Sequence, residues 1–516
     1  MKPVVKPENL KTQIHSLIVI VLILALSIIA SLLFLFLNST QLAAQSWQWG
    51  RVGNNLKTYQ TLYRNNKIAT DPHGNLYTIS IDSNINVPGY FREGYTKGGQ
   101  ALCIISYDCE GKHRWSKMIQ SGLDFEIKTD NVGGVYITGL IFPELMPVNL
   151  DEDTIIGITQ KKHFLLKYDS SGKYQWFRMF EPDTLNPAHK GYDYDGINFC
   201  VSPQGDIRVY AQLMSGVFCD GQYSVTDSFR TYHVLAYNSS GKFLGGNKLG
   251  FNSDVIEWDY KRDKFYQFGY AYDTLTYGNS VKPKSFVLCK MDNKGKLEWI
   301  KSGFLSKILD KQIDSKGNIY FSCIVPPDSA FDGHVFKNDS SKGDISAILK
   351  YSPDGQRLWV SSSKEGGGEV FSFAVNNNAI AAFGPISKLP LFIRWADGYE
   401  VGRSFKPSSY SFLLLDSFNL GNFFVRINAL DGKVFAVDSI LGSKLSTRSI
   451  VGNNNGGFYI LGDIGRAIKK MIIPFVDTLV YNVPSNQSSF SHPFLLKYGT
   501  PDCLPPVIID RDLSLM

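Results

Sequence analysis

The residues that could support metal binding or redox chemistry are few in this chain, and their spacing matches no familiar site. The seven cysteines are Cys103, Cys109, Cys200, Cys219, Cys289, Cys323 and Cys503. None forms a CxxC pair, which argues against a zinc site. Five of them fall in or beside apolar, strand-like runs and are expected to be small buried hydrophobic residues. Cys109 and Cys503 lie in polar turns, and an exported chain would allow a disulfide between them.

Acidic residues and histidines give no stronger signal. Asp193-Tyr-Asp195-Gly196 begins like a calcium loop and residues 151–153 are a compact acidic cluster, but neither continues with EF-hand ligand spacing. The three glycines at 366–368 lack the Lys-Ser/Thr of a phosphate loop. The histidines after residue 45 are scattered: His73, His113, His163, His189, His233, His334 and His492. We therefore predict no catalytic, cofactor-binding or metal-ligating residue and no cofactor, although a site assembled from distant segments would leave no local motif.

The elements that carry these residues are copies of one repeated unit. Residues 162–180 are KHFLLKYDSSGKYQWFRMF, an apolar run, a polar turn and a second run with a tryptophan. The pattern recurs at 101–118, 285–301 and 344–360, and without the tryptophan at 232–244. A second pattern, a strand, an Asp/Asn/Gly turn and an aromatic-rich strand, occurs seven times, from residues 68, 127, 201, 258, 313, 374 and 451. Such self-similarity predicts one supersecondary unit stacked many times.

Each unit predicts four short strands in two hairpins, because Gly and Asn supply the positive φ that hairpin turns need. A four-stranded antiparallel sheet repeated around an axis is a propeller blade, so the predicted fold is an all-β propeller of about seven blades. The last unit lacks its tryptophan strand, and an isolated tryptophan strand, Trp47 to Val52, precedes the first. We predict that this strand pairs with Phe494 to Tyr498 and closes the ring.

The sixth unit is the least regular. Between residues 384 and 448 two segments could supply its third and fourth strands, SYSFLLLDS from Ser409 and FFVRINALDGKVFAVDS from Phe423. Seven blades are predicted, with eight as the alternative.

Residues 1–45 are predicted to be a targeting segment and not part of the fold. The run that begins at Leu17 and ends at Leu37 is apolar apart from two serines, and a helix of that length reaches about 30 Å, enough to span a bilayer. The basic residues before it predict that the amino end stays in the cytoplasm. The segment is either a cleaved signal peptide or an uncleaved signal-anchor, and the sequence does not decide between them. The predicted propeller is 46–500, followed by a short tail, 501–516.

Composition is that of a packed, strand-rich protein. Aromatic residues are abundant (34 Phe, 27 Tyr, 8 Trp) and charged residues make up 19% of the 516. The net charge of +6 becomes +4 without residues 1–45, and no basic run is present. We therefore predict no nucleic-acid partner.

The repeats resemble the SBBP family, named for its seven-bladed β-propeller repeats and found mostly in exported bacterial proteins. The resemblance covers nearly all of 46–500 and is clearest in FLLKYDSSGKYQW and IDSKGNIYFSC. Such chains often end in a type IX secretion sorting domain, whereas a short tail follows the last strand here. The tryptophan pattern also resembles the repeat of quinoprotein dehydrogenases, but the adjacent Cys-Cys pair of one branch is absent, so this likeness concerns architecture.

Together these patterns predict an exported, monomeric propeller at the cell envelope or outside the cell, acting as a non-catalytic binding or scaffold module for a protein or glycan ligand. Its only membrane contact would be the N-terminal helix, if uncleaved. The long inserts 142–161, 326–343 and 385–407 are the predicted ligand surface, around the axis at one rim of the ring. The alternative is a glycan- or polymer-active enzyme with its site at the mouth of the central channel. Clustered acidic or metal-ligating side chains there would favour the enzyme.

Overall fold

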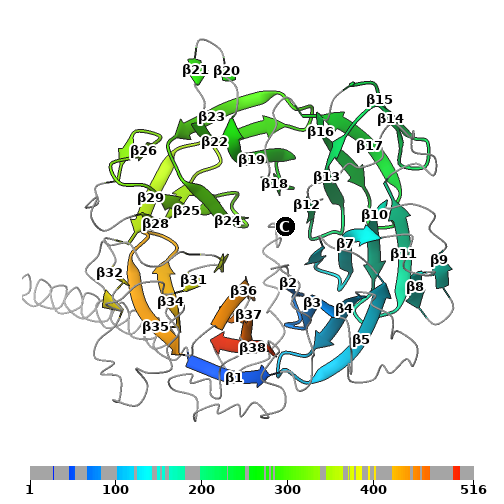
Figure 1. The fold of residues 1–516 in the computed structure, drawn as a ribbon, viewed down its shortest axis with the longest axis horizontal. Helices are drawn as coiled ribbons and strands as arrows, with labels where there is room; N and C mark the ends of the chain where they lie inside the picture. The colour runs from blue at the N-terminus through cyan, green and yellow to red at the C-terminus, as the bar shows by residue number, and fades with distance from the viewer. Residues whose placement is uncertain are drawn as a thin grey trace, which may run out of the picture.

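The computed structural model is a ring of antiparallel β-sheets (Figure 1). It describes residues 46–52, 67–82, 101–120, 125–141, 148–151, 154–156, 162–180, 198–228, 231–249, 255–271, 275–277, 280–282, 285–336, 344–363, 370, 372–376, 379–385, 393–394, 400–401, 421–441, 445–453, 456–464 and 492–499, and Ser27. No helix among these residues is long and apolar enough to cross a membrane. Apart from Ser27, the predicted targeting segment lies outside the described residues, as do 193–196, 366–368 and the tail.

Seven blades follow one another around the ring, each an antiparallel meander from its innermost to its outermost strand. Blades 1 to 3 are β2 (Lys67–Thr70), β3 (Leu76–Asp82), β4 (Ala101–Tyr107) and β5 (His113–Gln120); β6 (Glu126–Thr129), β7 (Val135–Ile141), β10 (Lys162–Tyr168) and β11 (Tyr174–Met179); and β12 (Asn198–Val201), β13 (Ile207–Leu213), β16 (Thr231–Tyr237) and β17 (Phe243–Lys248). Blades 4 to 6 are β18 (Val255–Asp259), β19 (Lys264–Ala271), β22 (Ser285–Asp292) and β23 (Leu297–Gly303); β24 (Lys307–Ile313), β25 (Ile319–Val325), β28 (Ile345–Tyr351) and β29 (Arg357–Ser362); and β30 (Ser372–Val375), β31 (Ala379–Pro385), β34 (Gly421–Asn428) and β35 (Val434–Leu441). Blade 7 is β36 (Leu445–Gly452), β37 (Phe458–Ile464), β38 (His492–Gly499) and β1 (Ser46–Val52).

The prediction of a seven-bladed all-β propeller is confirmed, and the described strands form no eighth blade. In the sixth blade the chain uses the second of the two candidate segments, since β34 pairs with β31 and β35 pairs with β34. The other candidate, from Ser409, lies outside the described residues.

Blade 7 is shared between the two ends of the propeller, as predicted. The register pairs Trp47 with Tyr498, Trp49 with Lys497 and Val52 with Phe494. Trp49 thus lies opposite a lysine of the third strand, as Trp176 lies opposite Lys167 in blade 2. The Gln48 side chain also donates a hydrogen bond to the Gly499 carbonyl, at 2.8 Å. This pairing joins the sheet of the last blade to the start of the ring and covers two strand edges.

The first turn of a blade is held by one aspartate. Oδ1 of Asp71 accepts hydrogen bonds from the amides of His73 and Asn75, and Oδ2 accepts one from the Tyr77 hydroxyl at 2.8 Å. Gly74 supplies the positive φ, 78°. The carboxylate-to-tyrosine bond recurs between Asp130 and Tyr136 and between Asp314 and Tyr320. The recurring Asp-x-x-Gly-x-x-Tyr pattern is therefore a set of turn contacts.

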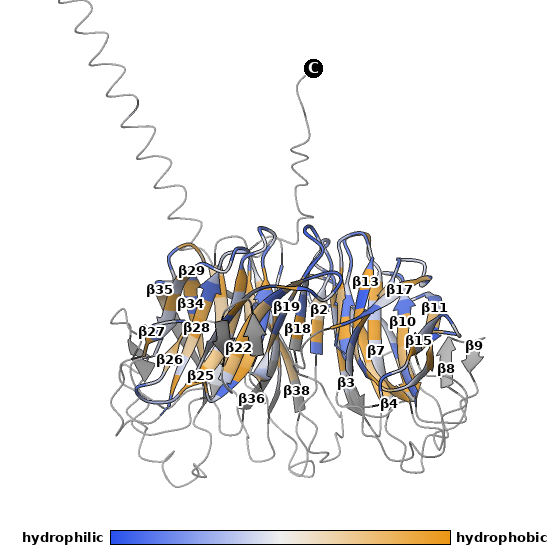
Figure 2. Cartoon of the chain, turned by 90° about the horizontal axis from the view of Figure 1, so that it is seen from above, coloured by the Kyte–Doolittle hydropathy of each residue, from blue (hydrophilic) through white to orange (hydrophobic). Residues whose placement is uncertain are grey.

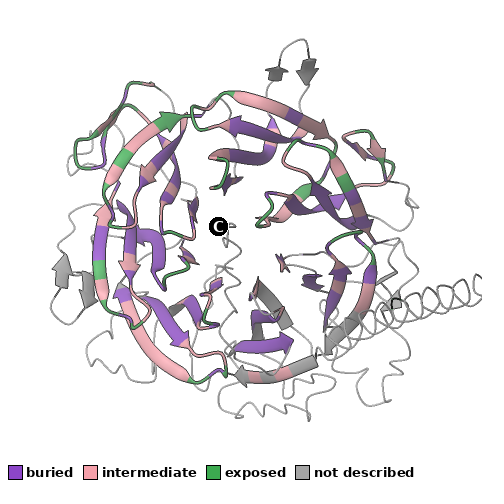
Figure 3. Cartoon of the chain, turned by 180° about the vertical axis from the view of Figure 1, so that it is seen from behind, coloured by how far each residue is buried: buried purple, intermediate pink, exposed green. Residues whose placement is uncertain are grey.

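Neighbouring blades meet where an indole reaches the second turn of the next blade. The indole Nε1 donates to a turn carbonyl in four places, from Trp115 to Ser170, Trp176 to Ser239, Trp299 to Pro353 and Trp359 to Ala429, at 2.9 to 3.2 Å. The turn glycine faces the indole closely, since a Cβ at Gly241 would lie 2.7 Å from the Trp176 ring. Trp176 and Trp359 are largely buried at these contacts, whereas Trp115 and Trp299 are only partly buried. The outermost strands keep part of their surface exposed, and the second and third strands of a blade are the most buried, whereas an innermost strand such as β24 is mostly half-buried (Figure 3).

A buried lysine reaches the same turn of the next blade in four places. The bonds run from the Nζ atoms of Lys167, Lys290, Lys350 and Lys497 to the carbonyls of Ser239, Pro353, Ala429 and Cys109, at 2.7 to 3.3 Å. Each ammonium also lies within 6.0 Å of the centre of a tyrosine ring of its own blade. Figure 2 shows apolar strands and hydrophilic turns. The lysine and tryptophan hydrogen bonds to these turns connect each of these blades to the next.

Removal of the closing strand should open the ring. Deleting residues 46–52 exposes one edge of β38, so we expect a lower thermal midpoint and concentration-dependent aggregation, measured by calorimetry and light scattering. Deleting residues 1–45 is the control and should leave the midpoint unchanged. Equal midpoints for both deletions would contradict closure by β1.

Truncating a seam tryptophan should be costly, because it leaves a cavity and removes one of the two donors to the turn carbonyl. Trp359→Ala should lower the free energy of unfolding by about 3 to 5 kcal/mol in urea titrations. The adjacent Leu358 is 44% exposed, so Leu358→Ala should cost no more than about 0.5 kcal/mol. Similar losses for both variants would argue against the seam contact.

Candidate functional site

The inserts predicted to form a rim around the axis lie elsewhere. Their described parts are short hairpins: β8 (Val148–Asp151) with β9 (Thr154–Ile156), β26 (Ala330–Phe331) with β27 (His334–Val335), and β32 (Ile393–Arg394) with β33 (Glu400–Val401). Two further hairpins are β14 (Gly216–Phe218) with β15 (Tyr223–Val225) and β20 (Leu275–Tyr277) with β21 (Ser280–Lys282). All five stand at the outer circumference (Figure 1), and β26 pairs with the outermost strand β23 of the preceding blade. The prediction of an axial rim is therefore wrong for these hairpins, because they cover outer strand edges.

Charged side chains from distant segments instead meet on the innermost strands. Members of this group, called the axial cluster here, are Lys67 on β2, Glu126 and Lys128 on β6, Cys200 on β12, Glu257 on β18, and Asp310 and Lys311 on β24. These strands open five consecutive blades and surround the axis of the ring (Figure 1).

Contacts between neighbouring blades hold the cluster together. Lys67 Nζ and Glu126 Oε1 form an ion pair of 2.6 Å across blades 1 and 2. Across blades 5 and 6, Oδ2 of Asp310 accepts hydrogen bonds of 2.9 Å from the Ser372 hydroxyl and the Phe373 amide. Three lysines and three carboxylates thus face one another with a balanced formal charge.

Burial and neighbouring charge shift the pKa values of these groups in opposite directions. Burial opposes ionisation of Glu126, but Lys67 and Lys128 outweigh it and hold its pKa below the ordinary value. Burial likewise disfavours the charged form of Lys128, but Glu257 and Glu126 outweigh it and raise its pKa. Burial raises the pKa of Glu257, and Lys128 and Lys311 offset this only in part.

Two further members are biased toward their neutral forms. Burial raises the pKa of Asp310 despite its hydrogen bond from the Phe373 amide and the charge of Lys311. Burial, followed by the charge of Glu257, raises the pKa of the Cys200 thiol to about 12. Because the thiolate is the nucleophile and metal ligand, Cys200 is unsuited to either role at neutral pH.

The histidines and acidic residues considered in the sequence analysis do not belong to the axial cluster. Within the described part of the chain, no three His, Cys, Asp or Glu residues gather in metal-binding geometry. His233 lies 2.8 Å from both the Tyr223 and Thr231 hydroxyls, and burial lowers its pKa to about 4. Only Asp151 of the 151–153 cluster is described, at the end of β8.

The five cysteines expected to be buried are buried free thiols: Cys103, Cys200, Cys219, Cys289 and Cys323. Cys109, in the second turn of blade 1, is disulfide-bonded. Its predicted partner, Cys503, lies outside the described residues.

Sequence inspection missed the axial cluster and the seam lysines. Aligning the opening strands on their turns would have found part of the cluster. Lys128, Cys200 and Glu257 each lie two residues before the residue that begins the first turn, which is Asp130, Ser202 or Asp259. The seam lysines recur in the sequence Leu-Lys-Tyr at residues 166–168, 349–351 and 496–498.

Comparison with known proteins shows no family. No family model matches the chain, and no curated protein matches it in sequence. Three solved structures with some similarity are a hydrazine synthase from Kuenenia stuttgartiensis (11% identity, TM-score 0.40, 79% of this chain and 94% of that one), the rhamnogalacturonan lyase YesW (11%, 0.33, 90% and 76%) and a protein of unknown function from Bacteroides caccae (10%, 0.27, 57% and 80%). At these values the likenesses carry no argument about activity, and the SBBP resemblance is not confirmed.

The opposite pKa shifts of Glu257 and Glu126 predict opposite effects of neutralisation on stability. Glu257 has a raised folded pKa, so its contribution to the free energy of unfolding falls as pH rises from the unfolded value, about 4.3, through the folded one. Glu126 has a lowered folded pKa, so its contribution is present above the unfolded value and is lost as pH falls through the folded one.

Glu257→Gln should therefore be more stable than the parent at neutral pH, and Glu126→Gln less stable. Both differences should shrink at about pH 3, where unfolded carboxyl groups are largely protonated. Urea titrations across this pH range provide the measurement. A shift of the same sign for both variants at neutral pH would rule out the assignment.

Proposed function

We propose that this propeller is a non-catalytic binding or scaffold module, exported from the cytoplasm, for a protein or glycan ligand. The proposal includes membership of the SBBP family, supported by the repeat sequences already described and by the seven-bladed ring.

The observation that carries the proposal is that the axial cluster is used to join blades. Glu126 is engaged by Lys67 and Asp310 by Ser372 and the Phe373 amide. The side chain of Gln312 likewise donates to the Phe373 carbonyl and accepts from the Val375 amide. Carboxylates so occupied support a structural centre, and ligand binding is then left to the outer surfaces and loops.

Export is supported by the bonded state of Cys109. Disulfides persist in oxidising compartments and are rare in the cytosol, while the other described cysteines are buried and separate. The apolar run that ends at Leu37 supplies the targeting element, as a cleaved signal peptide or an anchor.

One observation favours the alternative of a glycan- or polymer-active enzyme. Glu257 and Asp310, from adjacent blades, both have raised pKa values, as a general acid requires. A polymer cleaved at the axis would use this pair.

Polymer binding and polymer turnover can be separated directly. The purified chain should retard alginate, polygalacturonate or peptidoglycan fragments in affinity electrophoresis and release no reducing ends or unsaturated products from them. Release of products that falls at least about a hundredfold in Glu257→Gln would establish the enzyme instead. Retardation of none of these polymers would argue against a glycan ligand.

Export can be tested with intact cells whose outer envelope is permeabilised. External protease should digest the propeller, and mass spectrometry of the unreduced protein should find Cys109 joined to Cys503. An amino terminus near Ser46 would indicate cleavage and one at Met1 an anchor. A propeller protected from the protease, with reduced Cys109, would contradict export.

A further inference from the structure

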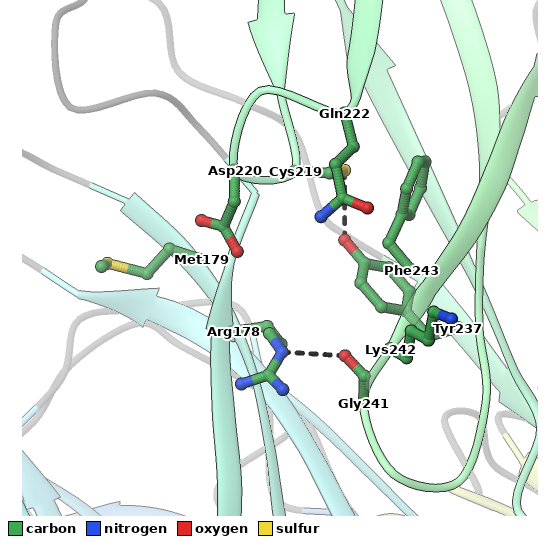
Figure 4. Close-up of a pocket in the computed structure, with 9 residues that line it drawn as sticks. All are labelled: Arg178, Met179, Cys219, Asp220, Gln222, Tyr237, Gly241, Lys242 and Phe243. Carbon is green, nitrogen blue, oxygen red and sulfur yellow. Dashed lines mark hydrogen bonds between the residues drawn. The ribbon is translucent and has the colours of Figure 1, made fainter.

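A pocket of about 240 Å³ lies on the outer side of the ring between blades 2 and 3 (Figure 4). Its walls come from β11, from the β14–β15 hairpin that leans back onto blade 2, and from the second turn of blade 3. The amide of Cys219 fixes the hairpin by donating to the Phe180 carbonyl at 3.1 Å. The volume is below the roughly 300 to 1,000 Å³ of sites for drug-sized ligands, so it suits a small molecule or one unit of a polymer.

A guanidinium group is held at the inner wall of this pocket. Nε of Arg178 donates to the Gly241 carbonyl at 2.8 Å, and Nη1 donates to the Phe177 carbonyl at 2.7 Å. The guanidinium carbon lies 5.7 Å from the centre of the Trp176 ring. These contacts hold two of the three guanidinium nitrogens, and Arg178 lines the pocket (Figure 4).

The repeat provides an internal comparison at blades 4 and 5. There the β26–β27 hairpin also leans back onto the preceding blade, where β26 pairs with β23 and the Asp332 amide donates to the Ser302 carbonyl at 3.0 Å. The Asp332 carboxylate lies 3.5 Å from Lys301 Nζ, and Lys301 occupies the strand position of Arg178. At this seam the hairpin residue Asp332 is the anionic partner of Lys301.

At blades 2 and 3 a cysteine replaces that aspartate. Cys219 accepts a hydrogen bond from the Tyr237 hydroxyl at 3.1 Å and has the positive φ of Asp332, 55° against 48°. Among the described residues, no carboxylate lies within ion-pair distance of Arg178. Within the described part of the chain, this seam therefore keeps its cation without the ion pair found at the equivalent seam.

We propose that this pocket binds the carboxylate of a uronic-acid unit, with Arg178 as the carboxylate ligand. The guanidinium N–H groups that the two backbone carbonyls leave over can donate charge-assisted hydrogen bonds to a carboxylate. Asp220 and Gln222 at the mouth offer partners for sugar hydroxyls, and Phe243 offers an apolar surface for the ring.

The charge of the lining selects among small anions. The lining has two cationic side chains, Arg178 and Lys242, and one carboxylate, Asp220, so its net formal charge is +1. This charge favours a monoanion over a neutral zwitterion. Asp220 disfavours a phosphate dianion by repulsion. The inference names a ligand class for the binding function proposed above. The pocket lies on the outer face, so its failure would leave other surfaces open to that function.

Titration with sodium galacturonate, followed by saturation-transfer NMR or calorimetry, tests the proposal. The full chain should bind galacturonate saturably and galactose, glycine and inorganic phosphate at least about tenfold more weakly. Arg178→Gln should weaken galacturonate binding by a similar factor. Lys301→Gln is the matched control at the equivalent seam and should leave binding unchanged.

Cys219→Asp tests the comparison between seams. The new carboxylate should pair with Arg178 as Asp332 pairs with Lys301, so galacturonate binding should be lost while the thermal midpoint is retained. Cys219→Ser should keep binding. Undetectable binding by the parent, equal binding of galactose, tighter binding of glycine or phosphate, or full binding by Arg178→Gln or Cys219→Asp would each overturn the proposal.

Discussion

The ring depends on one repeated interaction, the hydrogen bonding of a turn carbonyl by the preceding blade. At blades 2, 4 and 5 a tryptophan and a lysine of one blade donate to the same carbonyl of the next, as Trp359 and Lys350 do to Ala429. Ala429 is buried, so both donors replace hydration that its carbonyl has lost. The glycine of the turn allows the indole to approach, because any side chain at Gly432 would meet the Trp359 ring. Turn geometry, aromatic packing and blade order are thus linked in one contact.

The lysines show how a charged residue is tolerated inside a seam. Lys350 is only 6% exposed, and burial lowers its pKa, yet it has a carbonyl acceptor and lies over the Tyr320 ring, 5.1 Å from the centre. Lys497 makes the same contact with the turn of Cys109 across the seam between blades 7 and 1. The closing seam therefore uses the lysine contact of the other blades in addition to the pairing of β1. Cys109, whose carbonyl accepts this bond, is itself disulfide-bonded.

The fold was predictable because its signals are local and repeated, whereas the site was not. Asp/Asn/Gly turns recur in all seven units and tryptophan strands in most of them, and the isolated strand at Trp47 identified the closure. The sixth blade was ambiguous because two apolar segments compete there, and strand pairing chose between them. The axial cluster brings Lys67 and Asp310 together through folding, and aligning the opening strands on their turns points to only part of it. The inserts were misplaced to the axis because nothing in their sequence indicates that they lean back over an outer strand.

The most direct test of the seam contact is a double-mutant cycle on Trp359→Phe and Lys350→Met, measured by urea unfolding with circular dichroism. Each single variant leaves the Ala429 carbonyl with one donor, while the double variant leaves it buried with none. The account predicts that the double variant loses more stability than the sum of the single losses, by on the order of 1 kcal/mol. Strictly additive losses would contradict a shared carbonyl as the contact that holds the blades together.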